Sequence, residues 1–186
     1  MRIIAGELKG KRILFPMNKS TRPLRDMVKE SIFNLIENSN KFDLEINCSE
    51  ILDLFSGSGS FGLECISRGA KKVVFFENYS QTLKILRKNI LDLELKEKCD
   101  VLEEDAFNFF QYKKIIEKKF NIIFIDPPFK ERKTYLLIEE ILEKKILTND
   151  GIIIIHRHIK DDVIISDKFR VLDTRSYGIS KIIIGH

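Results

Sequence analysis

Four consecutive residues, Asp126-Pro127-Pro128-Phe129, place a carboxylate, two prolines and an aromatic ring directly after an apolar run at 120–125. Each proline fixes φ at about −65°, donates no amide hydrogen and pushes the preceding residue into an extended conformation. The Asp126 carboxylate and the local carbonyls should therefore present acceptors in one direction, beside the flat Phe129 ring. This arrangement suits a planar substrate carrying N–H₂ and predicts methylation of an exocyclic amine. The alternative is a rigid corner between strand and loop.

A glycine-rich loop is predicted upstream, in the segment LDLFSGSGSFG at 52–62. Gly57, Gly59 and Gly62 form a G-x-G-x-x-G pattern between a predicted strand and a predicted helix, where backbone can approach a ligand and helix amides are free. Glu77 ends the next strand, where a carboxylate can accept from both ribose hydroxyls. Dinucleotide-binding proteins share both features, so this pattern alone leaves the cofactor open.

Two acidic positions favour S-adenosylmethionine over a dinucleotide. Asp53, just before the glycines, suits an ammonium group better than a diphosphate, because two anions would repel. Glu104-Asp105-Ala106 closes the third strand, where an acidic group can accept from an adenine amine. The alternative is a packing turn in which Glu77 and Asp105 cap helices. The predicted cofactor-binding residues are Asp53, Phe55, Gly57, Gly59, Gly62, Glu77, Asn78, Asp105 and Ala106.

The apolar pattern predicts an alternation of strands and helices that can position these residues. Strands are expected at 51–55, 73–77, 100–102, 120–125 and 151–156, and helices at about 60–68, 79–94, 106–116 and 133–145. Two more strands, 169–176 and 179–184, are separated by only Tyr177-Gly178 and must be antiparallel. We therefore predict an α/β fold, a doubly wound sheet of five parallel strands plus a C-terminal antiparallel hairpin.

The N-terminal part is predicted to be a basic extension. Segments 2–5 and 11–15 indicate a small β-hairpin, and 25–38 a helix. Residues 1–34 hold eight Lys/Arg against three Asp/Glu, whereas the rest of the chain holds 24 against 25. This asymmetry favours contact with a polyanion, and the alternative is a solvated arm. We predict an RNA-facing extension, 1–40, and a catalytic domain, 41–186, with phosphate contacts from Lys9, Lys11, Arg12, Arg22 and Arg25.

Several other classes of protein are disfavoured. The apolar runs are far shorter than the roughly 18 residues of a membrane span. The three cysteines are widely spaced and suit free thiols in a reducing cytosol. His156 and His158 share one face of a strand, but no motif supplies a third ligand, so no metal is expected. We predict a monomeric cytoplasmic protein.

The order of these motifs resembles class I S-adenosylmethionine-dependent methyltransferases, with their Rossmann-like sheet. The N-terminal sequences RIIAG (2–6), LKGKR (8–12), TRP (21–23) and KESIFN (29–34), together with DLFSGSG (53–59), DPPF and Tyr177-Gly178, are similar to the RsmD family. The resemblance implies methylation of N2 of a guanine in 16S rRNA, guanine 966, on an assembled small ribosomal subunit. The chain departs from the family at Ala5, Asn78 and Leu24, where the family usually has Gly, Asp and Thr.

Three alternatives remain open from the residues. DPPF-like motifs also serve adenine methyltransferases of DNA and glutamine methyltransferases of proteins. The glycine loop also fits a nucleotide-binding oxidoreductase. A basic extension on this fold also fits a catalytically silent RNA-binding assembly module.

Overall fold

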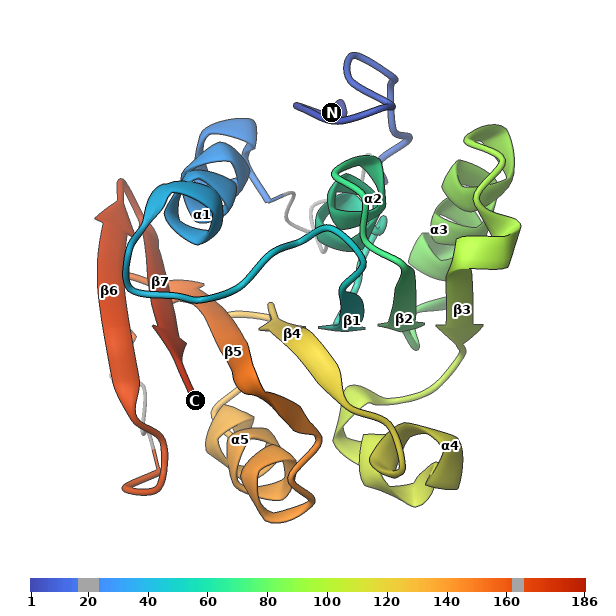
Figure 1. Cartoon of the computed structure of the whole chain (residues 1–186). Coiled ribbons are helices and arrows are strands. Elements are labelled where there is room, and N and C mark those ends of the chain that lie inside the picture. Colours follow the sequence, from blue (N-terminus) through green and yellow to red (C-terminus); the bar gives the residue numbers. More distant parts are fainter. Residues whose placement is uncertain (17–23, 162–165) are drawn as a thin grey trace.

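The computed structural model describes residues 1–16, 24–161 and 166–186, and their strands form one sheet in the order β3-β2-β1-β4-β5-β7-β6 (Figure 1). The strands are β1 (Glu50–Leu54), β2 (Lys72–Phe76), β3 (Cys99–Leu102), β4 (Phe120–Ile125), β5 (Leu147–His158), β6 (Val171–Tyr177) and β7 (Ser180–Gly185). The helices are α1 (Asp26–Asn38), α2 (Ser60–Ser67), α3 (Ser80–Asp92), α4 (Lys113–Ile116) and α5 (Thr134–Glu143), with 3₁₀ turns η1 (Lys96–Lys98) and η2 (Ala106–Gln111).

The strand directions confirm the predicted topology. β1 to β5 are parallel, and β7 pairs antiparallel with both β5 and β6. The two-residue connection Gly178-Ile179, with Gly178 at φ 60°, reverses the chain one residue later than predicted and allows β7 to lie between β5 and β6. None of the helices in the described part of the chain is long and apolar enough to cross a bilayer.

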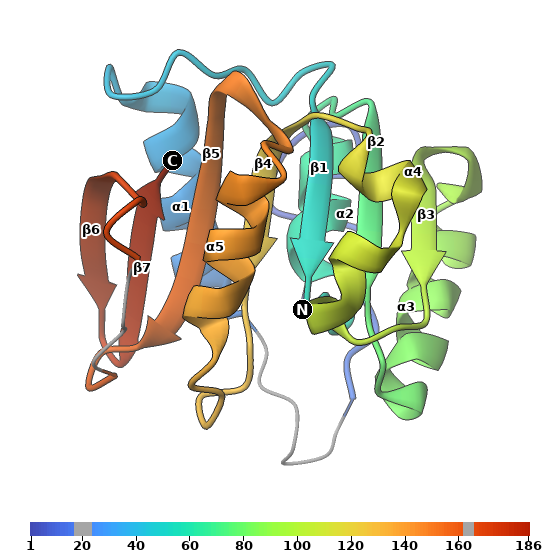
Figure 2. The same ribbon diagram turned by 90° about the horizontal axis from the view of Figure 1, so that it is seen from below.

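Helices cover both faces of the sheet (Figure 2). α1, α2 and α3 lie on one face, and α4 and α5 lie on the other. Successive side chains of a strand point to opposite faces, so each buried strand contributes to two cores. In β4, Ile122 and Phe124 pack in the first core, and Ile123 and Ile125 pack in the second. Polar side chains are thereby confined mainly to the strand ends, where the cavity described below lies.

The predicted N-terminal β-hairpin is present in a reduced form, an antiparallel bridge between Arg2 and Arg12 flanked by backbone hydrogen bonds from Ile3 N to Lys11 O at 2.9 Å and from Ile13 N to Met1 O at 3.1 Å. Two other amides of the segment bond to α2: Ile4 N and Ala5 N donate to the Glu64 carboxylate at 2.8 and 2.9 Å. Ile3 joins the same core as the sheet. The extension is therefore held onto α2 by side-chain acceptors, and its role as a separate RNA-facing unit stays a prediction.

Two predicted element bounds also need correction. The helix expected at 106–116 is a 3₁₀ turn, η2, followed by the single turn α4, and the two meet at Tyr112, whose ψ of 100° is extended. Asp105 starts η2 by accepting from Phe107 N at 2.9 Å, a short cap that favours a tight turn. β5 is longer than the expected 151–156 and begins at Leu147, across an irregularity in its pairing with β4.

A buried ion pair fixes the extension and α1 to α2. Lys29 Nζ lies 3.3 Å from Glu64, and both side chains are 0% exposed. Burial lowers the pKa of Lys29, opposed by the Glu64 carboxylate. Arg68 donates to Glu64 and also pairs with Glu37, whose side chain is 38% exposed.

We expect Glu64→Leu to lower the free energy of unfolding by about 3–5 kcal/mol, because it leaves the Lys29 cation buried without its partner. Glu37→Gln should cost less than about 1 kcal/mol, because that pair is partly exposed to water. Urea denaturation at neutral pH measures both. Equal losses for the two variants would contradict the importance assigned to the buried pair.

Candidate active site

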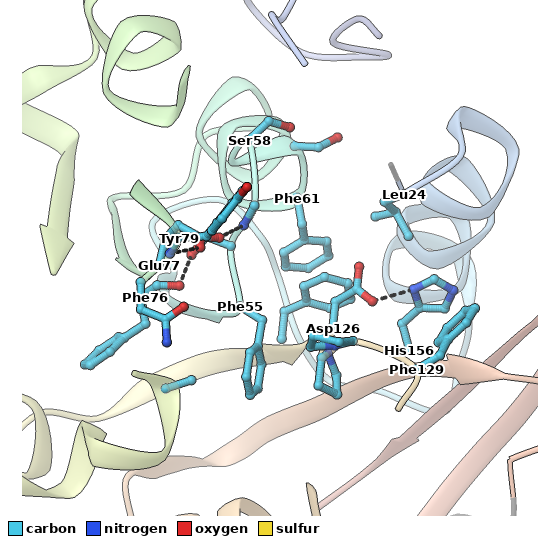
Figure 3. A pocket seen from close by; sticks show the side chains of 18 of the residues that line it. Leu24, Phe55, Ser58, Phe61, Phe76, Glu77, Tyr79, Asp126, Phe129 and His156 are labelled. Carbon is cyan, nitrogen blue, oxygen red and sulfur yellow. Dashed lines mark hydrogen bonds and ion pairs between the residues drawn. The ribbon is translucent and has the colours of Figure 1, made fainter. Parts of the chain in front are cut away.

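A cavity of about 720 Å³ lies at the carboxyl ends of β1, β2 and β4 (Figure 3). The register brings these ends to one level, since Leu54 of β1 is paired with Phe76 of β2 and with Ile125 of β4. Residues immediately after the three strands, Phe55, Glu77 and Asp126, therefore line the same space. Ligands of α/β sheets bind at such an edge, where neighbouring connections leave in opposite directions.

Most of the predicted site residues line this cavity. Those in its wall are Phe55, Gly57, Glu77, Asn78, Ala106, Asp126, Pro127, Pro128 and Phe129. Asp53, Gly59, Gly62 and Asp105 lie outside the wall. The glycine loop and the end of β4 thus line one cavity. The contacts of these residues with a ligand stay predictions.

The glycines of the loop have different surroundings. Gly57 has φ 57°, and a Cβ built there would meet nothing within 4 Å, so its backbone faces open space. A Cβ on Gly62 would lie 2.4 Å from the Phe75 ring, so this glycine allows α2 to approach β2 closely. Gly57 therefore leaves the backbone accessible from the cavity, whereas Gly62 allows close packing of α2 on β2. The non-glycine residue Phe55 also has a positive φ, 62°, which turns the chain into the loop.

Asp53 lies behind the glycine loop and is 1% exposed. Its Oδ2 accepts from Gly62 N at 3.1 Å, while Oδ1 is buried without a hydrogen-bond partner among the described residues. Burial raises the pKa of Asp53 well above its ordinary value, and the nearby Asp126 and Glu77 carboxylates add to the rise. The carboxylate thus supports the loop from below, outside the cavity wall.

Two carboxylates do face the cavity from β2 and β3. Glu77 is 9% exposed and accepts from Gly57 N at 2.8 Å and from Tyr79 N at 2.7 Å. Burial raises the pKa of Glu77, partly offset by those backbone donors. At the end of β3 the lining acid is Glu104, which accepts from the Tyr112 hydroxyl at 2.9 Å. The Asp105 carboxylate is used to cap η2.

Asp126 is held by a histidine from the neighbouring strand. Asp126 Oδ1 lies 2.8 Å from His156 Nδ1, and His156 Nε2 lies 2.9 Å from Ser180 Oγ. The Phe129 ring makes edge contacts with His156 and His158, at centroid distances of 6.0 and 5.1 Å. In the described ranges no three His, Cys, Asp or Glu side chains gather as a metal-binding group. His156 supports the Asp126 carboxylate, a role that the sequence analysis missed.

Arg157 clamps the loop that follows Asp126. Its guanidinium, 4% exposed, donates to the carbonyls of Pro128 at 3.3 Å, Phe129 at 3.2 Å and Glu131 at 2.6 Å. Arg157 also pairs with Asp161 at 3.0 Å. The sequence signal for this clamp is a polar pair, His156-Arg157, that directly follows an isoleucine run.

The N-terminal extension completes the wall through Phe15 and Leu24. Leu24 is 5% exposed, so the departure from the family's Thr puts an apolar side chain against the cavity. Four of the predicted phosphate contacts, Lys9, Lys11, Arg12 and Arg25, are exposed on this extension. The fifth, Arg22, lies outside the described residues.

Comparison with known proteins gives consistent matches. A family profile described as "Conserved hypothetical protein 95" matches residues 1–186. YlbH of Bacillus subtilis is 38% identical over 154 residues, 83% of this chain and 80% of that protein. "Ribosomal RNA small subunit methyltransferase D" of Haemophilus influenzae is 31% identical over 180 residues, 96% of this chain and 90% of that protein. The crystal structure of HI0767 from Haemophilus influenzae has a TM-score of 0.77 at 28% identity, covering 99% of this chain and 96% of that one.

We expect Asp53→Asn to raise the free energy of unfolding by roughly 1 kcal/mol at pH 7.5, because it removes a poorly solvated carboxylate. The pKa of Asp53 is higher in the folded protein than its ordinary value of 3.8. Protonated Asp53 therefore stabilises the folded wild type fully below pH 3.8, and this stabilisation is lost as the pH rises through the pKa of the folded state. Urea unfolding between pH 5 and 8 should thus show a flatter pH dependence for the variant. Asp167→Asn, at an exposed position, is the control. Identical pH profiles for wild type and Asp53→Asn would contradict the raised pKa.

Arg157→Lys should loosen the loop after Asp126, because one ammonium cannot span the three carbonyls that the guanidinium reaches. We expect faster hydrogen exchange of the amides at 129–133 and a loss of about 1–3 kcal/mol in the free energy of unfolding. The exposed Arg170→Lys should change neither quantity. Unaltered exchange at 129–133 would show that Arg157 does not hold this loop.

Proposed function

The chain belongs to the family described as "Conserved hypothetical protein 95", the RsmD family, and we propose that it methylates the exocyclic N2 amine of a guanine in 16S rRNA, of the guanine 966 type. Its sheet is the Rossmann-like sheet of class I methyltransferases. One observation carries the proposal: the open glycine loop and the acceptors of the DPPF corner line the same cavity. That cavity has room for a methyl donor on one side and a flat acceptor on the other.

Two features of the cavity, and one carboxyl group behind its wall, fit S-adenosylmethionine as the donor. The backbone at Gly57 is open to a ligand, and Glu77 presents a carboxylate to the same space, where it suits ribose hydroxyls. Asp53 Oδ1 is buried without a partner among the described residues, which favours a cationic group such as the ligand's ammonium above the loop. Gly57, Glu77, Asn78 and Ala106 would line the binding site of the cofactor.

When bound, S-adenosylmethionine supplies a methyl group whose bond to sulfur breaks, with the electron pair left on sulfur, as the amine nitrogen bonds to the carbon. The protein prepares that amine, which is a weak nucleophile because its lone pair is delocalised into the purine. Hydrogen bonds from its N–H groups to the Asp126 carboxylate and the Pro127 carbonyl favour a pyramidal nitrogen with an available lone pair. Asp126 then accepts the proton that the methylated nitrogen loses and passes it to water.

Phe129 provides a surface on which a purine can stack. The ring is half-buried and is fixed by its edge contacts with His156 and His158. A base extracted from folded RNA loses its stacking neighbours, and an aromatic side chain restores part of that energy. The Arg157 clamp keeps the ring and the carboxylate in one rigid corner, which favours in-line attack.

The N-terminal extension supports an RNA substrate. It presents the exposed Lys9, Lys11, Arg12 and Arg25 while Phe15 and Leu24 of the same extension line the cavity. Phosphate contacts give affinity without sequence information, so selectivity must come from the shape of the substrate. We propose 16S rRNA within an assembled or assembling small ribosomal subunit, in keeping with the name of the Haemophilus influenzae relative.

Asp126→Ala should lower the rate of methyl transfer by about 10²- to 10³-fold, because an acceptor aimed at the reacting amine is lost. Binding of S-adenosylhomocysteine, measured by calorimetry, should change little. The assay is transfer of labelled methyl groups to small-subunit particles from cells that lack this protein, with mass-spectrometric mapping of the modified guanine. Asp167→Ala, at an exposed position, is the matched control.

The methyl-transfer assay, together with measurements of NADH and S-adenosylhomocysteine binding, separates the competing functions. Label found only in duplex DNA or in a release factor would replace rRNA by another amine substrate. NADH binding without S-adenosylhomocysteine binding would indicate an oxidoreductase. Cofactor binding without methyl transfer to any RNA would favour a silent assembly module.

A further inference from the structure

We propose that His156 is the positioning residue of the catalytic carboxylate: it donates a hydrogen bond to Asp126 Oδ1 and thereby aims Oδ2 at the substrate amine. The inference rests on the proposed function and adds a residue to it. Asp126 and His156 follow paired residues of neighbouring parallel strands, since Ile125 of β4 is in register with Ile155 of β5. The backbone itself therefore places the two side chains side by side, with 2.8 Å between Oδ1 and Nδ1 (Figure 3).

The surroundings of His156 fix the orientation of its ring. Its side chain is 7% exposed, against 20% for Asp126, so the imidazole is the deeper member of the pair. On the far side of the ring, Nε2 lies 2.9 Å from the hydroxyl of Ser180, which is itself 4% exposed. With a hydrogen on Nδ1 the ring donates to Asp126 while Nε2 pairs with the Ser180 hydroxyl, so both ring nitrogens have a hydrogen-bond partner.

This arrangement divides the two oxygens of Asp126 between two tasks. Oδ1 accepts from the buried imidazole, which leaves Oδ2 as the oxygen available to an N–H group in the cavity. A carboxylate without this contact could rotate about its side-chain torsions, and a misplaced acceptor loses much of its effect on the rate.

The decisive comparison is between His156→Leu, which removes the donor, and His156→Asn, whose side-chain amide can replace the Nδ1 hydrogen. We expect His156→Leu to slow single-turnover methyl transfer to unmodified small-subunit particles by about 10²-fold, with unchanged affinity for S-adenosylhomocysteine. His156→Asn should recover most of that loss. His186→Leu is the matched control. His186 follows Gly185, which is paired with Ile153, three residues before His156 along β5.

A second measurement needs neither catalysis nor a folded leucine variant. The hydrogen-bonded Nδ1 proton of His156 should give a downfield NMR resonance in the wild type that shifts upfield in Asp126→Ala. Ser180→Ala, which keeps His156, should slow methyl transfer by a smaller factor than His156→Leu.

Wild-type rates in His156→Leu, or an asparagine variant no faster than the leucine variant, would overturn the inference while leaving the proposed function intact. A wild-type protein that binds S-adenosylhomocysteine but methylates no RNA would instead refute the proposed function. In that case the NMR resonance still decides whether His156 positions Asp126, and its insensitivity to Asp126→Ala would count against the pair.

Discussion

The common level at which β1, β2 and β4 end is the constraint on which the rest of the structure depends. Both faces of the sheet are covered by helices, so the strand interiors are apolar and polar groups collect where the strands stop. The register of Leu54 with Phe76 and Ile125 brings the next residue of each strand to one cavity. A shift by one residue in any of the three would turn its functional side chain to the opposite face.

Buried polar groups stabilise this edge from outside the cavity. Lys29 and Glu64 fasten the N-terminal extension to α2, and the same extension supplies Leu24 to the cavity wall. On the other side, β5 holds the DPPF corner through His156 and Arg157. Prolines remove amide donors from that corner, so its carbonyls need donors from elsewhere, and the guanidinium of Arg157 supplies them.

Isoleucine dominates the centre of the sheet, whereas the residues around the cavity are chemically diverse. β5 shows the transition within one strand: it runs through four buried isoleucines into His156 and Arg157 and ends at His158. Polar side chains buried at such a place are costly unless they have partners, and both His156 and Arg157 are hydrogen-bonded to groups of the cavity rim. The energetic cost of burying His156 and Arg157 is consistent with a role in positioning the DPPF corner rather than in packing alone.

Local patterns in the sequence were sufficient for the five parallel strands, the C-terminal hairpin, the glycine loop and the DPPF corner, because alternation of apolar residues, glycine spacing and proline act over a few residues. The 106–116 helix was predicted wrongly, because a side-chain cap tightened η2, and the N-terminal hairpin is shorter than predicted, because Ile4 and Ala5 donate to an acceptor on α2. Only the tertiary structure decided that Glu104 rather than Asp105 lines the cavity and that Asp53 lies behind it. It also paired Asp126 with His156, thirty residues away, since contacts between strands depend on register, which no local pattern encodes.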